Sequence, residues 1–195
     1  MIFTAPDLPQ QPLSEPLIYL NGPIQGCADW QREALTILTQ HTSRNMHFAN
    51  PRAKSFNGKL EDQLQWSQVL QEQAAVNGVQ LFLFPKETSH RCNRSYAQAA
   101  RFELGEWAIK SQAGLARVVV GFERGFTGGA YLRRRLQLSY PNIPVCSSIR
   151  QTCMVAIEMA KSQPTALAYP YLKAGLRPPA LGTLVQGLGG VSDDD

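Results

Sequence analysis

The clearest strand signal in this 195-residue chain is Val79-Gln80-Leu81-Phe82-Leu83-Phe84, which Pro85 stops. A short apolar run closed by proline is typical of a strand covered on both faces, as in a parallel sheet. Weaker runs of the same kind lie on both sides of it in the chain and end at turn-forming residues. They are Leu17–Leu20, Met46–Ala49, Arg117–Phe122 and Ile143–Cys146. The sequence therefore predicts five strands.

Helical periodicity fills the intervals between these strands. Apolar residues recur at helical spacing over 29–40 and 60–76, and Asp29 is a candidate N-cap. Further helices are expected at 96–110, 130–139 and 151–161. Alternating strands and helices predict a parallel sheet with helices on both faces, and right-handed connections favour a doubly wound, flavodoxin-like α/β fold.

Composition divides the chain into three parts. Residues 1–16 are rich in Pro and Gln and are expected to form an irregular lead-in, whereas 17–162 form the α/β domain. Residues 163–195 form a Pro- and Gly-rich tail that still holds several Leu and Tyr. Because disordered segments are usually poorer in such residues, we expect the tail to pack on a neighbouring protomer or across its own crevice, and the alternative is a disordered extension.

Charge and cysteine usage exclude several classes of protein. The net charge of +4 is modest and is not gathered into the stripe of a nucleic-acid polymer binder, although Arg133–Arg135 come close. No apolar run reaches the length of a membrane span, and the N-terminus lacks the features of a signal peptide. The four cysteines show no CxxC spacing, so we expect reduced thiols in a cytoplasmic protein with no metal.

Ligands of doubly wound folds bind beyond the carboxyl ends of the strands. That rule places 21–27, 50–56, 85–95 and 121–129 around one crevice. The first of these loops, Asn21–Gly26, matches neither the dinucleotide fingerprint nor the Walker pattern, so it is either a ligand-binding loop or a plain turn. Cys27 and Cys92 would need His90 as a base to act as nucleophiles, which we consider a weak alternative.

Two residues could carry chemistry at this crevice. Glu103 follows the central strand on a helix, between Phe102 and Leu104, and is either a partly buried reactive carboxylate or an ordinary surface glutamate. Gly105 interrupts the same helix, which close packing or ligand approach would explain. Tyr19 lies within the first strand, where its hydroxyl needs a partner, and is either a site residue or a core tyrosine.

The order and spacing of several short motifs resemble the nucleoside 2-deoxyribosyltransferase-like family. The resemblance covers roughly residues 17 to 150. It is carried by Leu17–Ile24, Trp30, Asn50-Pro51-Arg52, Gln63, Trp66, Phe82–Phe84, Glu103-Leu104-Gly105 and Val118–Gly121.

This resemblance implies a flavodoxin-like fold and a double displacement at the anomeric carbon of a nucleoside. Glu103 matches the family's nucleophile, and Tyr19 matches the tyrosine that contacts and orients it, so we expect a hydrogen bond between them. The candidate substrate contacts are Asn21, Gly22, Pro23, Ile24, Asn50, Arg52, Phe56 and Trp66. No cofactor is expected, and family members commonly assemble as homo-oligomers in which neighbouring subunits complete the pocket.

The chain departs from the family's pattern at base-handling positions. Ala97 stands where many members have an acid, Ser67 follows Trp66 where relatives often carry an acid, and Asn77-Gly78 replaces the usual Ala-Asp. These differences leave open transfer or hydrolysis on a nucleoside or nucleotide. Alternatives are a NAD-consuming glycohydrolase, with Phe56 and Phe126 as the candidate aromatics, and a non-catalytic nucleotide-binding or sensor module.

Overall fold

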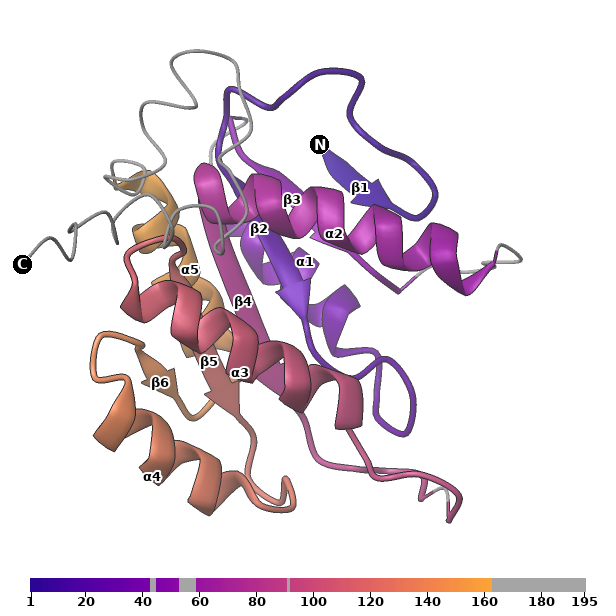
Figure 1. The fold of residues 1–195 in the computed structure, drawn as a ribbon, viewed down its shortest axis with the longest axis vertical. Helices are drawn as coiled ribbons and strands as arrows, with labels where there is room; N and C mark the ends of the chain where they lie inside the picture. The colour runs from indigo at the N-terminus through magenta and orange to yellow at the C-terminus, as the bar shows by residue number, and fades with distance from the viewer. Residues whose placement is uncertain (43–44, 53–58, 91, 163–195) are drawn as a thin grey trace, which may run out of the picture.

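The computed structural model describes residues 1–42, 45–52, 59–90 and 92–162 as one six-stranded parallel sheet with five helices (Figure 1). The strands lie in the order β1-β3-β2-β4-β5-β6. Their bounds are β1 Ile2–Thr4, β2 Leu17–Asn21, β3 His47–Asn50, β4 Gly78–Phe84, β5 Val118–Phe122 and β6 Val145–Cys146. The doubly wound α/β prediction is confirmed, and the order reverses between β2 and β4, where β2 pairs with both β3 and β4.

The sheet has one strand more than the sequence predicts. β1 lies within the expected irregular lead-in and pairs with β3, with Ile2 opposite Phe48 and Thr4 opposite Asn50. Three residues are too few to show alternation, so only the partner strand reveals this segment as a strand. Phe3 is 5% exposed and packs with Trp66, which anchors the edge of the sheet.

The helices follow the predicted intervals closely. They are α1 Trp30–His41, α2 Leu60–Val76, α3 Gln98–Gln112, α4 Gly129–Ser139 and α5 Ile149–Lys161. Asp29 caps α1 as expected, because its side chain accepts a hydrogen bond from the Arg32 backbone N–H. Ser148 caps α5 in the same way through Gln151, so that helix starts two residues earlier than predicted.

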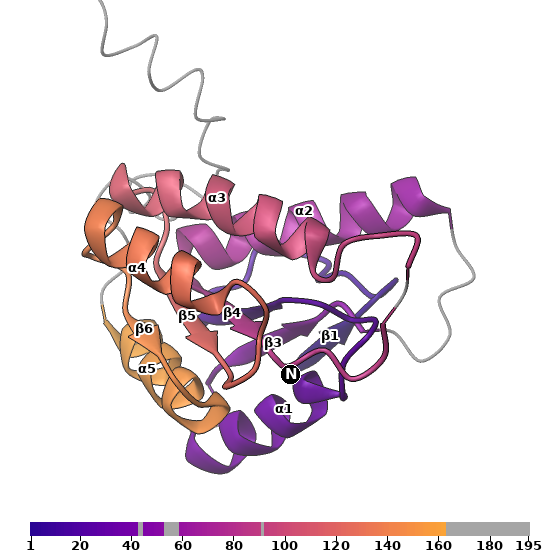
Figure 2. The ribbon, with the colours of Figure 1, turned by 90° about the horizontal axis from the view of Figure 1, so that it is seen from below.

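The helices cover the two faces of the sheet unequally. α1 and α5 lie on one face, whereas α2, α3 and α4 lie on the other (Figure 2). Alternation along β2 sends Ile18 and Leu20 to α1 and α5, and Tyr19 to α2. Tyr19 therefore lies on the side of the sheet that carries the Glu103 helix, α3.

None of the helices in the described ranges combines the length and apolar character that crossing a membrane requires.

Candidate functional site at the carboxyl edge of the sheet

The loop after β2 is built around one backbone oxygen, the carbonyl of Pro23. It accepts hydrogen bonds from Trp30 Nε1 at 2.9 Å, Gln31 Nε2 at 3.4 Å and the Cys27 thiol at 3.3 Å. Gly22 is required beside it, because a Cβ there would come within 2.3 Å of the Leu83 carbonyl oxygen. The loop is therefore held in place at the carboxyl edge of the sheet, with Pro23 buried and its neighbour Ile24 half-buried.

Arg52 braces this loop from the neighbouring strand end. Its Nε donates to Gln31 Oε1 at 2.9 Å, its Nη2 lies 3.4 Å from the Ala28 carbonyl, and its Nε lies 3.3 Å from Asp29. Asn50 accepts the backbone N–H of Arg52 at 2.9 Å. Both residues were predicted to contact substrate, yet the groups named here are engaged within the protein.

Two other predicted substrate contacts lie under the surface. Asn21 is 1% exposed, and Trp66 is 2% exposed with its indole N–H donating to the Asp7 carbonyl at 2.7 Å. Neither presents surface to a ligand in this conformation, since Trp66 fills the gap between α2 and the lead-in. The sequence motif therefore overstates how many of these residues face outward. Phe56 lies outside the described residues.

The Glu103 carboxyl group is half-buried on α3, between the exposed Phe102 and the buried Leu104. Burial, with a smaller contribution from the negative charge of Glu106, raises its pKa to about 7. No residue in the described parts of the chain donates a hydrogen bond to this carboxylate. A carboxyl group that is poorly solvated and titrates near neutrality is a candidate for chemistry rather than for solubility.

The sequence analysis offered close packing as one reason for a glycine at position 105, but the structure shows no close packing there. A Cβ at this position would meet no atom within 4 Å, so α3 presents open surface there. Phe102, one turn earlier, is 77% exposed, and Ile109 is 53% exposed. This side of α3 is therefore apolar and uncovered within the described residues, whereas Leu104 and Trp107 pack against the sheet.

Tyr19 lies on the predicted face, but its nearest hydrogen-bonding neighbour differs from the prediction. Its ring is 2% exposed and lies 6.0 Å, centroid to centroid, from that of Trp66. Burial raises the pKa of its phenol above the ordinary value, a hydrogen bond from Ser67 opposes this, and the charge of Glu103 adds to the increase. Within the described residues, Tyr19 and Ser67 form the polar pair, and Glu103 acts on Tyr19 through its charge. Ser67 is the residue that sequence reasoning noted only as a departure.

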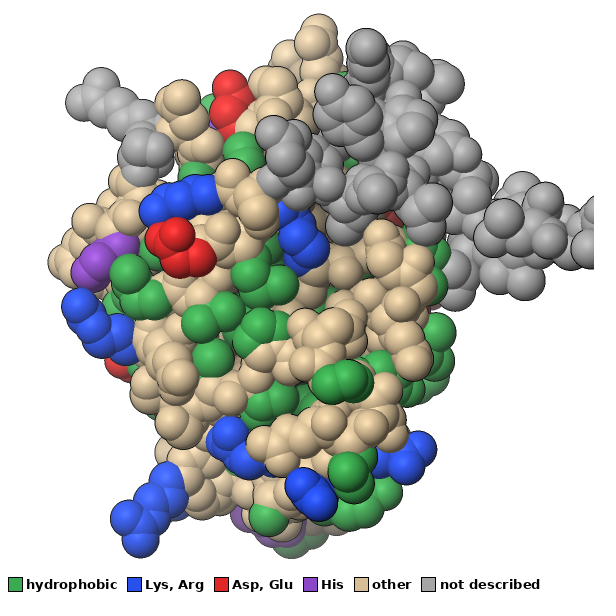
Figure 3. All heavy atoms as spheres, turned by 90° about the vertical axis from the view of Figure 1, so that its left-hand side faces the viewer, with side chains coloured by type: hydrophobic (Ala, Val, Ile, Leu, Met, Phe, Trp, Pro, Cys, Tyr) green, Lys and Arg blue, Asp and Glu red, His purple; other side chains and the backbone are tan. Residues whose placement is uncertain are grey.

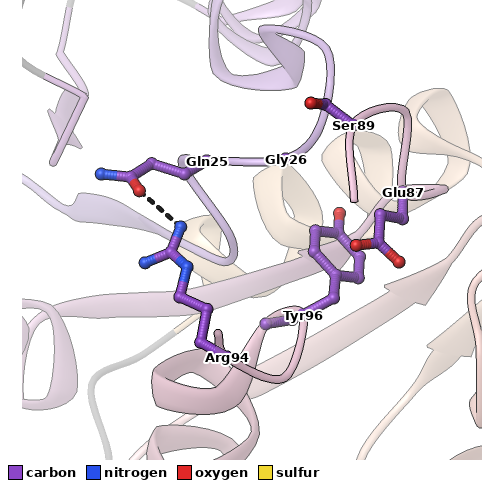
Figure 4. A pocket seen from close by; sticks show the side chains of 7 residues that line it. Gln25, Gly26, Glu87, Ser89, Arg94 and Tyr96 are labelled. Carbon is purple, nitrogen blue, oxygen red and sulfur yellow. Dashed lines mark hydrogen bonds between the residues drawn. The ribbon is translucent and has the colours of Figure 1, made fainter. Parts of the chain in front are cut away.

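The loops after β2 and β4 are joined over the carboxyl edge. Thr88 and Ser89 donate backbone N–H groups to the Gly26 carbonyl at 2.8 and 3.3 Å, and Arg94 binds Gln25. Between them lies a small open pocket, lined by Gln25, Gly26, Glu87, Ser89, Arg94, Tyr96 and Ala97 (Figure 4). The Tyr96 hydroxyl donates to the Pro85 carbonyl at 2.9 Å.

The thiols do not support nucleophilic chemistry. Burial raises the pKa of Cys27, and its thiol donates to the Pro23 carbonyl. His90 lies 3.1 Å from Glu87 rather than against either crevice cysteine. A thiol held in its protonated form is a poor nucleophile, so Glu103 is the better candidate. In the described ranges, no three His, Cys, Asp or Glu side chains come together as a metal site.

No family model matches this sequence, and no curated protein matches it.

Proposed function

We propose that this chain cleaves or transfers the N-glycosidic bond of a nucleoside or nucleotide through a covalent glycosyl-Glu103 intermediate. The observation that carries the proposal is the half-buried Glu103 carboxyl group, with a pKa of about 7, on the face that also carries Tyr19. The sequence resemblance assigns the same two residues to catalysis. A carboxylate nucleophile requires this kind of site, because exclusion of water strengthens its interaction with positive charge that develops on the sugar.

The chemistry follows from two displacements. In the first, an ionised Glu103 oxygen bonds to the anomeric carbon while the C–N bond breaks, and the base leaves with the electron pair and takes up a proton. In the second, water or another base attacks the same carbon, loses a proton and releases the carboxylate, so the configuration is retained overall. Tyr19, whose raised pKa keeps it protonated, can donate a hydrogen bond without losing its proton.

The structure bears on the alternative functions through two residues. Phe126 was a candidate for stacking on nicotinamide, but it is 6% exposed and packs against Phe84 and Phe122, with ring centroids 5.1 and 5.9 Å away. It offers no free ring face of the kind a NAD glycohydrolase would use. A non-catalytic module would have no need for the cost of burying Glu103.

A substrate panel tests the proposal. Purified chain is incubated with nucleosides, nucleotides and NAD, with and without an acceptor base, and products are separated by chromatography. We expect release of free base from at least one nucleoside or nucleotide. Mass spectrometry of acid-quenched enzyme is expected to show a pentosyl adduct on the Glu103 peptide. Absence of both base release and adduct across the panel contradicts the proposal.

We also propose that the protein acts in the cytoplasm as a homo-oligomer. Large hydrophobic side chains are exposed on neighbouring helices of the Glu103 face, Leu60 and Leu64 on α2 and Phe102 and Ile109 on α3. Hydrophobic side chains also gather in the middle of the side formed by α4, β6 and α5, with Lys and Arg at its margins (Figure 3). Exposed apolar surface of this kind favours association.

Light scattering tests the assembly. We expect a mass above that of one chain, reduced towards the monomer in a Leu64→Glu and Phe102→Glu double variant. If the unaltered protein itself has the mass of one chain, the proposal is contradicted. The tail at 163–195, which was expected to pack on a neighbour, lies outside the described residues.

A further inference from the structure

Three side-chain amides, two of them buried and that of Gln71 half-buried, join β2, β4 and α2. Gln71 Nε2 donates to Asn21 Oδ1 at 2.8 Å, and Asn21 Nδ2 donates to Gln80 Oε1 at 2.8 Å. Gln80 Nε2 then donates to the backbone carbonyl of Gln71 at 2.6 Å, which closes the ring. We call these three residues the amide ring. Every hydrogen bond in it runs in the same direction around the ring.

Filling part of the core with the amide ring costs free energy. Gln80 is fully buried in the middle of β4, and Asn21 is 1% exposed. Buried amides stabilise the fold no better than apolar side chains of similar size unless every donor and acceptor is hydrogen-bonded. A network in which all of them are hydrogen-bonded also holds one defined geometry. None of the ring atoms is among the buried polar atoms that lack a partner in the described residues. The network therefore fixes the position of α2 against the sheet more sharply than packing alone would.

What the ring fixes is the neighbourhood of Tyr19. Gln80 lies directly opposite Tyr19 in the pairing of β2 with β4, and Asn21 Nδ2 also lies 3.4 Å from the Tyr19 carbonyl. Ser67 precedes Gln71 by four residues, so the two share one side of α2. Ser67 therefore lies one helical turn before Gln71, the residue through which α2 takes part in the amide ring.

We propose that Gln71 and Gln80 are positioning residues, which act through the amide ring to hold Ser67 against the Tyr19 phenol. Because the Ser67 hydroxyl donates a hydrogen bond to the Tyr19 oxygen, the phenol proton is free to point towards the carboxyl edge of the sheet. The kinetic part of this inference rests on the proposed function, whereas the structural part does not.

The experiment measures the surroundings of the Tyr19 hydroxyl group directly, through the NMR signal of its ring carbon. Protein labelled with ¹³C at the tyrosine Cζ is compared across variants by NMR, and Tyr19→Phe identifies the Tyr19 signal among the six tyrosines. Ser67→Ala is expected to shift that signal, and Gln71→Met is expected to shift it in the same direction. Gln68→Met is the matched control, because Gln68 is exposed on the same helix and donates a hydrogen bond to Glu72 at 3.1 Å.

Kinetics provide the second readout. Gln71→Met is expected to lower kcat about tenfold while KM changes by less than about twofold, because substrate contacts remain and only the aim of the phenol is lost. Gln80→Met is expected to behave alike. Since Gln80 is fully buried and its variant can fail to fold, the half-buried Gln71 decides the question.

The outcomes separate the two proposals. A Tyr19 signal that moves in Ser67→Ala but not in folded Gln71→Met overturns the positioning role, whatever the activity. A signal that moves in both, in a protein without glycosidic activity, supports the positioning role and overturns the proposed function.

Discussion

The two faces of the sheet are built from the same strands but from different kinds of side chain. Towards α1 and α5 the central strands present Leu81 and Leu83 from β4 and Ile18 and Leu20 from β2, all fully buried. Towards α2 and α3 the same strands present Tyr19, Asn21 and Gln80 among their apolar neighbours.

Buried polar groups cost stability unless they are paired, and the other face also has two, Gln31 on α1 and Thr152 on α5. The difference lies in the strands, because β2 and β4 direct polar side chains only towards α2 and α3 among the residues named here. The Glu103 carboxyl group lies on a helix of that same face. The comparison therefore separates a face that stabilises the protein from a face that we expect to carry the proposed function. Each prediction below tests one of the two faces.

The largest expected effect is on activity. Glu103→Gln removes the nucleophile while keeping the shape of the side chain, so we expect turnover to fall about a thousandfold, with the fold retained. Glu106→Gln is the matched control, since Glu106 is exposed on the same helix and pairs with Lys110 at 2.5 Å; it is expected to keep near-normal turnover. The measurement is base release under saturating substrate. Activity of Glu103→Gln above about one per cent would falsify the mechanism.

The opposite face predicts loss of stability without loss of chemistry. Leu81→Ala leaves a cavity in the core under α1 and α5, so we expect the free energy of unfolding to fall by about 3 kcal/mol in denaturant titration. Gln65→Ala, at an exposed position on α2, is expected to change it by less than about 0.5 kcal/mol. The turnover of folded Leu81→Ala is expected to match the unaltered protein. A kcat that falls with stability would remove the distinction between the faces.

Tyr19→Phe tests the polar face at its phenol. The ring remains against Trp66, and only the hydroxyl group is lost, so we expect kcat to fall about thirtyfold with a small change in KM. Tyr131→Phe, at a residue 71% exposed on α4, serves as the control. Equal kcat values for the two variants would assign Tyr19 to packing alone.

The smallest expected effect is on the pH dependence of stability. The folded-state pKa of Glu103, about 7, lies above the ordinary glutamate value of 4.5. The folded protein therefore holds a proton that the unfolded chain releases, and stability falls as the pH rises from about 4.5 through about 7. Glu103→Gln cannot ionise, so it should be more stable than the unaltered protein above this window, by a difference on the order of 1 kcal/mol after allowing for solvent screening. Below pH 4.5 the two should unfold alike.

Thermal unfolding at pH 4 and pH 8 measures this difference, with Glu158→Gln, at an exposed glutamate of α5, as the control. A Glu103→Gln advantage that is equal at both pH values would show that the carboxyl group does not titrate between them. The same ionisation predicts activity that rises through pH 7, because the nucleophile is the carboxylate.

The sequence determined the elements and their order. Apolar runs ended by Pro85 or by Asn21-Gly22 predict buried parallel strands wherever the pattern is long enough, and the one strand missed, Ile2–Thr4, is too short to carry a pattern. The sequence also located Tyr19 and Glu103, since both stand out as polar residues in otherwise apolar settings.

Only the tertiary structure decided which side chains near the carboxyl edge of the sheet bind other residues of the protein instead of facing a ligand. Arg52, Trp66 and Asn21 have the residue types and loop positions of ligand contacts, yet they bind Gln31, Asp7 and the amide ring. Ser67, Gln71 and Gln80 give no signal as isolated polar residues on a helix and a strand. Their roles depend on Tyr19 and Asn21 of β2, which lie 48 to 59 positions away in the chain and meet them only when α2 packs across β2 and β4. Local pattern reports which face of an element is apolar, whereas the partner of a buried polar group is set by packing between elements distant in sequence.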